Sequence, residues 1–223
     1  MNVRLAPSLL SADFARLADA LAMIEAGGAD MVHVDVMDGH FVPNLTLGPP
    51  VVRALRKATR LPLDVHLMIE SPERSLPEYL DAGADWISVH VEATRHLQRC
   101  LDGIRRAGAK AGAAINPGTP TLALSASWDV LDYAVVMSVN PGWGGQPFLE
   151  PSFEKVRRLH AESREAGSQL AIEVDGGVSR ANAGALVAAG AEILVAGAAI
   201  YGSEDPAAAV RALRDAARSA VRA

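Results

Sequence analysis

The sequence predicts an α/β fold in which residues 1–223 form a single domain, a (β/α)₈ TIM barrel. Eight short apolar runs alternate with amphipathic segments, and 223 residues is an ordinary length for such a barrel. The alternative is a doubly wound open sheet. That fold would carry a Gly-x-Gly-x-x-Gly fingerprint after its first strand, and this sequence has none there. The closed barrel is therefore the prediction.

A turn motif recurs where the amphipathic segments end. Residues 27–30 read Gly-Gly-Ala-Asp and residues 82–85 read Ala-Gly-Ala-Asp; related copies follow at 107–110, 189–192 and, more weakly, 166–169. Glycine just after a helix can adopt the left-handed conformation, which ends the helix and turns the chain into a strand. Five such turns predict helix-to-strand units along the whole chain.

The apolar runs, rich in β-branched residues, give the strands. In chain order we expect strands at Val3–Leu9, Met31–Val36, Leu63–Leu67, Trp86–Val89, Lys110–Ile115, Tyr133–Val139, Leu170–Val174 and Ile193–Ala196. The amphipathic segments between them give the helices. We expect these at about 13–26, 49–59, 73–82, 94–107, 152–166, 179–189 and 205–221, and a short helix can form near 121–126.

Composition and charge exclude several classes of protein. Half of the residues are hydrophobic and only 4% are aromatic, which predicts a core of Val, Leu, Ile and Ala. A net charge of −5 with scattered basic residues argues against nucleic acid as a partner. The lone Cys100 excludes an internal disulfide framework, and the most apolar stretch, Ile193–Tyr201, is too short to span a bilayer. We expect a cytoplasmic protein without a leader or a membrane partner. Since many barrels associate, we also expect a homo-oligomer.

Polar residues at the ends of three strands are the strongest functional signal. Alternate residues of a strand share a face, so His33 and Asp35 point one way while the valines around them point the other. Valines suit the helix-packed outside of a barrel, which leaves the polar residues facing inward. The same alternation turns His66 inward with Asp64 and Met68, and pairs Asp175 with Glu173. Inward residues at the carboxyl ends of strands form the active-site floor of such barrels.

These four inward residues predict a metal site. A single inward His or Asp is more often structural, but four at strand ends are costly to bury unless they pair or share an ion. The donors are nitrogen and oxygen with no thiolate, so one divalent ion among Zn²⁺, Fe²⁺, Mn²⁺ and Co²⁺ is expected. His90 and Glu92 end the fourth strand, where support for the ligands and a purely structural role are equally expected. Asp38 precedes a glycine and is expected to form a turn.

Three methionines and three glycine-rich loops complete the predicted site. Met37, Met68 and Met137 close their strands at one level; a core methionine is usually filler, but three could form a water-excluding wall over a reaction intermediate. Glycine-rich loops after the last three strands match the usual phosphate site of the barrel, where backbone N–H groups hold the anion. Their candidate phosphate-binding residues are Gly142, Gly144, Gly145, Gly176, Gly177, Gly197 and Ala198. The 140–150 loop is long enough to serve as a lid.

The sequence resembles the ribulose-phosphate 3-epimerase family from residue 5 to about residue 202. The matching segments are 6–13 Ala-Pro-Ser-Leu-Leu-Ser-Ala-Asp, 33–44 His-Val-Asp-Val-Met-Asp-Gly-His-Phe-Val-Pro-Asn, 64–68 Asp-Val-His-Leu-Met, 140–146 Asn-Pro-Gly-Trp-Gly-Gly-Gln and 175–178 Asp-Gly-Gly-Val, with Asn-Ala at 182–183. The family's fold is a (β/α)₈ barrel. Its members interconvert D-ribulose 5-phosphate and D-xylulose 5-phosphate, so the resemblance implies a small phosphorylated ketose as substrate.

Carried onto this chain, the resemblance implies a role for each site residue. His33, Asp35, His66 and Asp175 would be the metal ligands, and Asp35 and Asp175 would also be the acid/base groups on opposite faces of the substrate. Ser8 and His66 would contact the sugar. The family usually has Phe at the position of Trp143, which would alter the packing of the lid. It usually has Ser at the position of Ala198, so a hydroxyl contact to phosphate is lost here while the backbone N–H remains.

Three alternatives stay open at this point. An epimerase of a six-carbon ketose phosphate, such as D-allulose 6-phosphate, would use the same metal and phosphate sites. A decarboxylase of the orotidine-phosphate type would need a lysine among aspartates at strand ends, and the three lysines lie elsewhere. A phosphosugar-binding barrel without catalysis would have no need to retain all four ligands.

Overall fold

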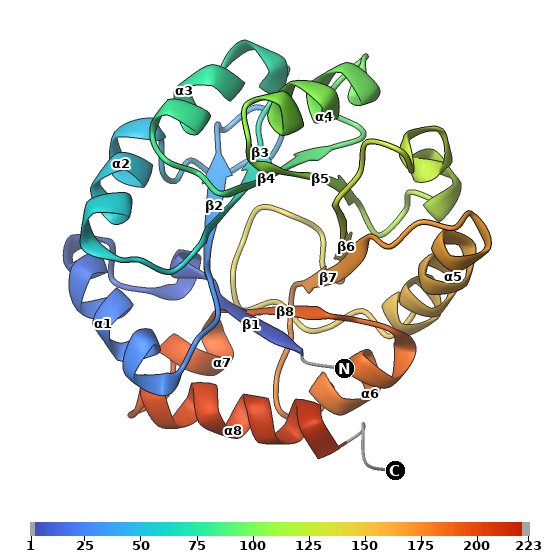
Figure 1. Cartoon of the computed structure of the whole chain (residues 1–223). Helices are drawn as coiled ribbons and strands as arrows, with labels where there is room; N and C mark the ends of the chain where they lie inside the picture. The colour runs from blue at the N-terminus through green and yellow to red at the C-terminus, as the bar shows by residue number, and fades with distance from the viewer. Residues whose placement is uncertain (1–2, 220–223) are drawn as a thin grey trace.

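The computed structural model describes residues 3–219, and a ring of eight parallel strands forms its centre (Figure 1). The strands are β1 (Arg4–Pro7), β2 (Val32–Met37), β3 (Leu63–Met68), β4 (Trp86–His90), β5 (Lys110–Ile115), β6 (Tyr133–Met137), β7 (Ala171–Asp175) and β8 (Ile193–Ala196). Strands β2 to β8 pair in chain order, and β8 pairs with β1. Between β1 and β2 the Asp30 N–H donates to the Leu5 carbonyl at 3.0 Å, and Ser8 forms a bridge with His33. The predicted (β/α)₈ barrel is confirmed.

Helices surround this ring on its outer side (Figure 1). They are α1 (Leu17–Gly27), α2 (Pro49–Ala58), α3 (Leu76–Asp81), α4 (Leu97–Arg106), α5 (Ser152–Glu165), α6 (Ala183–Ala189), α7 (Ala198–Tyr201) and α8 (Pro206–Ser219). A 3₁₀ helix at Thr121–Ser127 takes the place of an α-helix between β5 and β6. Further 3₁₀ turns span Leu9–Ser11, Phe14–Arg16 and Pro72–Arg74.

The glycine turns behave as predicted. The α1 helix ends at Gly28, whose φ of 82° is left-handed and whose N–H bonds back to the carbonyls of Ile24 and Glu25. Gly190 ends α6 in the same way, with a φ of 113°. These turns deliver the chain from the outer helices back to the inner strands, which is how the sequence motif builds the barrel.

Some element boundaries differ from the prediction. The first strand stops at Pro7, because the Ser8 hydroxyl oxygen accepts the Leu10 N–H and starts a 3₁₀ helix. Asp175 is the last residue of β7 and not the residue after it. The short α7 was not among the expected elements. The last expected helix, 205–221, is observed as Pro206–Ser219, and its final two positions lie outside the described residues.

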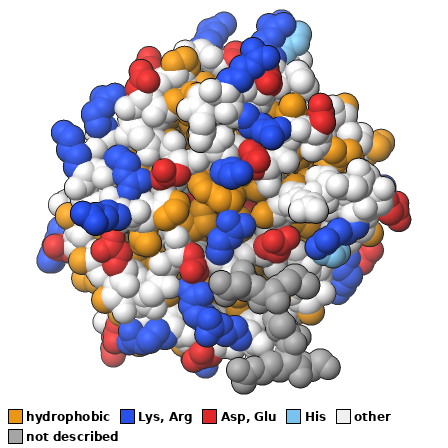
Figure 2. All heavy atoms as spheres, in the orientation of Figure 1, with side chains coloured by type: hydrophobic (Ala, Val, Ile, Leu, Met, Phe, Trp, Pro, Cys, Tyr) orange, Lys and Arg blue, Asp and Glu red, His pale blue; other side chains and the backbone are white. Residues whose placement is uncertain are grey.

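Alternate residues of a strand are buried in two different regions, one between the strands and the helices and one inside the ring of strands. Val32, Val34 and Val36 are buried between the strands and the helices, whereas His33 and Asp35 are buried inside the ring. Towards the amino ends of the strands the guanidinium of Arg4 lies 4.8 Å from the ring centroid of Trp86. Figure 2 shows hydrophobic side chains near the middle of one face of the molecule, among charged side chains of both signs. Among residues 3–219 no helix is long and apolar enough to cross a membrane.

Candidate active site

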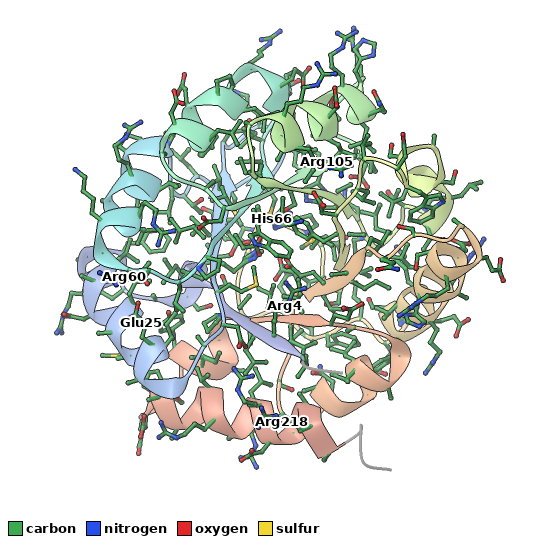
Figure 3. All side chains as sticks on the ribbon, in the orientation of Figure 1. Arg4, Glu25, Arg60, His66, Arg105 and Arg218 are labelled. Carbon is green, nitrogen blue, oxygen red and sulfur yellow. The ribbon has the colours of Figure 1, made fainter. Side chains whose placement is uncertain are left out.

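Strand register brings the four predicted ligand residues together. In the pairing of β2 with β3, His33 lies beside Asp64 and Asp35 lies beside His66. Asp175 enters from β7 on the other side of the ring, and His66 lies inside the ring of strands (Figure 3). One donor atom from each of His33, Asp35, His66 and Asp175 lies within 4.8 Å of the other three. The predicted cluster is therefore one site.

The spacing of these donor atoms fits a single cation. His33 Nε2 lies 3.4 Å from Asp35 Oδ1 and 3.8 Å from Asp175 Oδ2, and His66 Nδ1 lies 3.6 and 3.5 Å from the same two oxygens. Ligands about 2.1 Å from a tetrahedral ion would lie about 3.4 Å apart. His33 Nε2 and His66 Nδ1 are buried and have no hydrogen-bond partner within residues 3–219. These two unpartnered nitrogens aimed at two carboxylates form a set that could hold a metal ion.

The pKa shifts of the two histidines and of Asp35 reflect the attraction between the rings and the carboxylates. Burial by itself lowers the pKa of His33, but the charges of Asp35 and Asp64 outweigh it and raise that pKa well above its usual value. The pKa of His66 is also raised, since hydrogen bonding to Asp175 and Asp35 outweighs burial. Burial would raise the pKa of Asp35, but His33 and His66 hold it far below its ordinary range. The centre favours positive charge between its two carboxylates.

A layer of polar residues beneath the cluster supports His33. The Asp64 carboxylate lies 2.6 Å from His33 Nδ1, and its other oxygen accepts a hydrogen bond of 3.0 Å from the Tyr133 hydroxyl. Glu173 is fully buried; its carboxyl oxygens have no hydrogen-bond partner in the described part of the chain, and Oε1 lies 3.6 Å from His33 Nδ1. Burial, and then the charge of Asp64, raise the pKa of Glu173 well above its usual value. Sequence alone assigns no role to Asp64 and Glu173, although their inward positions, two residues before His66 and Asp175, are a usable signal.

His90 and Glu92 lie behind His66. The Nε2 atoms of His66 and His90 are 2.9 Å apart, and His90 Nδ1 lies 3.2 Å from Glu92 Oε2. Burial lowers the pKa of His90 to about 4. Burial would raise the pKa of Glu92, but its hydrogen bonds with His90, Thr119 and the Asn116 N–H lower it to about 2. For His90 and Glu92, the geometry favours support for His66 over a purely structural role.

A cavity opens above the cluster at the carboxyl ends of the strands. Asp35 and Asp175 face it, and the Ser8 hydroxyl at its wall donates to Asp35 Oδ2 at 2.5 Å. Met37, Met68 and Met137 are the last residues of β2, β3 and β6, and all three line this cavity. His33 and His66 are fully buried and lie behind these lining residues.

The three glycine-rich loops form the rest of the cavity wall. All seven candidate phosphate-binding residues line it: Gly142, Gly144, Gly145, Gly176, Gly177, Gly197 and Ala198. Gly177 has a φ of +64°, and a Cβ there would lie 2.7 Å from the backbone nitrogen of Phe148. Ser11 also lines the cavity beside Gly197, where a Cβ would meet the Ser11 hydroxyl at 2.5 Å; it is not among the predicted site residues, although it lies in the 6–13 segment that resembles the family.

The 140–150 loop is held in place by side chains. Gln146 Nε2 donates to the carbonyls of Asn140 and Trp143 at 2.7 and 2.9 Å, and Asn44 Nδ2 donates to the Gly142 carbonyl at 3.0 Å. Trp143 lines the cavity and is 55% exposed. Asp38 forms the expected turn, since its Oδ1 accepts the N–H groups of His40 and Phe41.

Comparison with known proteins agrees with this geometry. Residues 4–201 match the model of the Ribulose-phosphate 3 epimerase family. A ribulose-phosphate 3-epimerase of Bacillus subtilis (strain 168) is 49% identical over 213 residues, which cover 95% of this chain and 98% of that protein. The chloroplastic ribulose-5-phosphate-3-epimerase of Arabidopsis thaliana is 49% identical over 221 residues, covering 98% of this chain and 79% of that protein.

Solved structures share the fold at low sequence identity. KGPDC from Streptococcus mutans superposes with a TM-score of 0.73 at 17% identity, covering 98% of this chain and 99% of that one. A 3-hexulose-6-phosphate synthase gives a TM-score of 0.68 at 22% identity, covering 97% of this chain and 99% of that one. These two support the barrel alone. With a family model over most of its length and relatives at 49% identity, this chain belongs to the ribulose-phosphate 3-epimerase family.

Proposed function

We propose that the protein is a ribulose-phosphate 3-epimerase, an isomerase that interconverts D-ribulose 5-phosphate and D-xylulose 5-phosphate. The observation that carries the proposal is the pair of carboxylates, Asp35 and Asp175, which face one cavity from opposite sides of the barrel above two unpartnered histidine nitrogens. The family match and the names of the relatives support this activity. Those names also favour the five-carbon substrate over D-allulose 6-phosphate.

Asp35 and Asp175 would exchange the proton at carbon 3. Inversion next to a ketone requires removal of a proton from one face and delivery of a proton to the other, and each carboxylate would alternate between base and acid. The Ser8 hydroxyl donates to Asp35 Oδ2, which holds one carboxylate oxygen and leaves the other facing the histidines. Ser8 at the cavity wall, and His66 from behind the lining residues, would also contact the sugar. Proton removal gives an enediolate, and Met37, Met68 and Met137 would keep water away from it.

His33, Asp35, His66 and Asp175 would hold one divalent ion. Zn²⁺, Fe²⁺, Mn²⁺ and Co²⁺ suit their nitrogen and oxygen donors. When bound, such an ion supplies Lewis-acid stabilisation for the negative charge that develops on the substrate oxygens. It would also relieve the repulsion between two buried carboxylates.

The backbone N–H groups of the three glycine-rich loops would bind the substrate phosphate. Gly142, Gly144, Gly145, Gly176, Gly177, Gly197 and Ala198 line one side of the cavity. Glycine permits the positive φ angles of several of these residues and the close approach of the backbone to an anion. The single domain over residues 1–223, the cytoplasmic location and the assembly into a homo-oligomer remain predictions.

Turnover of two substrates tests the proposed function. The purified protein, loaded in turn with each of the four metals, would be assayed with D-ribulose 5-phosphate and with D-allulose 6-phosphate under matched conditions. We expect kcat/KM to favour the five-carbon substrate with at least one metal. A preference for the six-carbon substrate with every active metal would contradict the assignment.

A further inference from the structure

We propose that Glu92 and His90 form a relay that fixes the tautomer of His66, so that the Nδ1 atom of His66 is free to bind the metal ion. The inference rests on the proposed metal centre and assigns positioning roles to two residues outside the ligand set. Histidine ligands in metal sites usually donate their second N–H to a carboxylate, a carbonyl or water, and that partner fixes the tautomer. For His66 the partner is another imidazole.

The contact between the imidazoles of His66 and His90 has room for only one hydrogen between the two nitrogens. His66 Nε2 and His90 Nε2 are 2.9 Å apart, both side chains are buried, and their rings are nearly parallel at an interplanar angle of 17°. At this distance one nitrogen must carry the hydrogen and the other must accept it. The direction of this one hydrogen bond therefore decides which nitrogen of His66 has a free lone pair.

Glu92 sets that direction. Its Oε2 lies 3.2 Å from His90 Nδ1, while its Oε1 accepts the Asn116 N–H at 2.9 Å and a hydrogen bond from the Thr119 hydroxyl. An ionised carboxylate is only an acceptor, so His90 Nδ1 carries the hydrogen and His90 Nε2 accepts from His66. The opposite arrangement would place a lone pair of His90 against a carboxylate oxygen. In the neutral form of its ring, His66 is left with an unprotonated Nδ1, which faces Asp35 and Asp175 at 3.6 and 3.5 Å.

The surrounding structure holds this relay in place. The Lys155 ammonium group donates to the carbonyls of Asn116, Pro117 and Thr119, at 2.8, 2.6 and 2.9 Å, and so fastens the loop that binds Glu92. The ring of Phe41 packs 4.8 Å from that of His90. Lys155 thus supports the loop that holds Glu92.

Replacement of Glu92 by glutamine tests the direction of the hydrogen bond with little change of shape. The glutamine oxygen is needed by Asn116 and Thr119, so its NH₂ group would face His90 Nδ1. His90 would then accept at Nδ1 and carry its hydrogen at Nε2, against His66. We expect Glu92→Gln to weaken Zn²⁺ binding about 10- to 100-fold, the usual effect of losing an orienting partner. A residue that only fills space would tolerate this substitution.

Two further variants and one control keep the test independent of folding effects. His90→Leu removes the acceptor for His66 and should weaken Zn²⁺ binding to a similar extent. His90→Gln offers an amide oxygen in its place and should restore most of the affinity. Ser88→Ala is the matched control. It removes a buried hydroxyl from β4, the strand that carries His90, and that hydroxyl has no hydrogen-bond partner in the described part of the chain.

The measurements are Zn²⁺ affinity by competition with a chelator, and ¹H–¹⁵N NMR of the histidine rings in the Zn²⁺-loaded protein. We expect the hydrogen of His66 on Nε2 in the unmodified protein, and weaker binding in Glu92→Gln and His90→Leu but not in Ser88→Ala. Binding by Glu92→Gln and His90→Leu within about twofold of the unmodified protein, or a hydrogen on His66 Nδ1, would overturn the relay alone. Failure of the unmodified protein to bind Zn²⁺, Fe²⁺, Mn²⁺ or Co²⁺ would overturn the metal centre and the relay with it.

Discussion

The Nδ1 atom of His33 lies 2.6 Å from the Oδ2 atom of Asp64, and both side chains are fully inaccessible to solvent. A carboxylate accepts hydrogen bonds, so the neutral ring of His33 carries its hydrogen on Nδ1 and turns an unprotonated Nε2 towards Asp35 and Asp175. The two histidines of the centre are thus oriented through different nitrogens: His33 directly by a carboxylate, and His66 through His90. The metal would meet Nε2 of one ring and Nδ1 of the other.

Asp64→Asn should weaken Zn²⁺ binding about 10-fold. The Asp64 carboxylate orients the His33 ring and increases the basicity of His33, and a neutral amide would do neither as well. Chelator competition would measure the change. Tyr133→Phe is the matched control, since it removes the other hydrogen bond to Asp64 and leaves the contact with His33 intact. A larger loss of affinity in Tyr133→Phe than in Asp64→Asn would contradict this role for Asp64.

Asp175→Asn should abolish turnover and leave the fold intact. An amide cannot accept and return a proton, and general acid–base groups contribute about 10²- to 10⁴-fold to rate. The side chain is 13% exposed at the edge of the cavity, so the substitution should cost little stability. Steady-state kinetics and thermal unfolding would check both parts. Normal activity in this variant would rule out the scheme with two bases.

Gly177→Ala should raise the KM for substrate about 10-fold or more and lower the melting temperature, because a new Cβ would lie 2.7 Å from the Phe148 backbone nitrogen. Gly145→Ala is the matched control: its φ is also positive, at +74°, but no heavy atom of the described chain outside its immediate neighbours lies within 4 Å of the new Cβ. Gly145→Ala therefore introduces similar backbone strain but no close contact of the new Cβ. Equal effects of the two substitutions would show that close packing at Gly177 is unimportant.

Glu92 should make the stability of the metal-free protein sensitive to acid. Its pKa is lowered from 4.5 to about 2 in the folded protein; burial opposes the shift, and hydrogen bonds to His90, Thr119 and Asn116 produce it. A carboxyl group with a lowered pKa stabilises the fold above its unfolded pKa, and this contribution is lost as the pH falls from about 4.5 towards 2. Urea unfolding at several pH values in this range should therefore show a smaller loss of stability in Glu92→Gln. Parallel pH profiles for the two proteins would contradict the assignment.

The part of the site that could be predicted depends on alternation along single strands. His33, Asp35 and His66 could be assigned to the inner face because neighbouring valines mark the outer one. The glycine loops could be placed at the same end because they follow strands. Features that depend on a single strand or on the loop that follows it could therefore be predicted.

The part that could not be predicted depends on register and ring orientation. Asp64 was known to face inward, but its contact with His33 requires the pairing of β2 with β3. The roles of His90 and Glu92 could not be separated from packing, because they depend on which ring nitrogens meet. The α7 helix has four residues, too few to show a helical period.

The most direct test of the central claim is proton NMR of the metal-loaded protein with D-ribulose 5-phosphate in deuterated water. We expect D-xylulose 5-phosphate to appear with deuterium at carbon 3, since the proton removed from one face is replaced by one derived from solvent on the other. Exchange at carbon 3 without epimerisation would mean that only one carboxylate works on this substrate. No change in the spectrum with metal bound would contradict the proposed substrate.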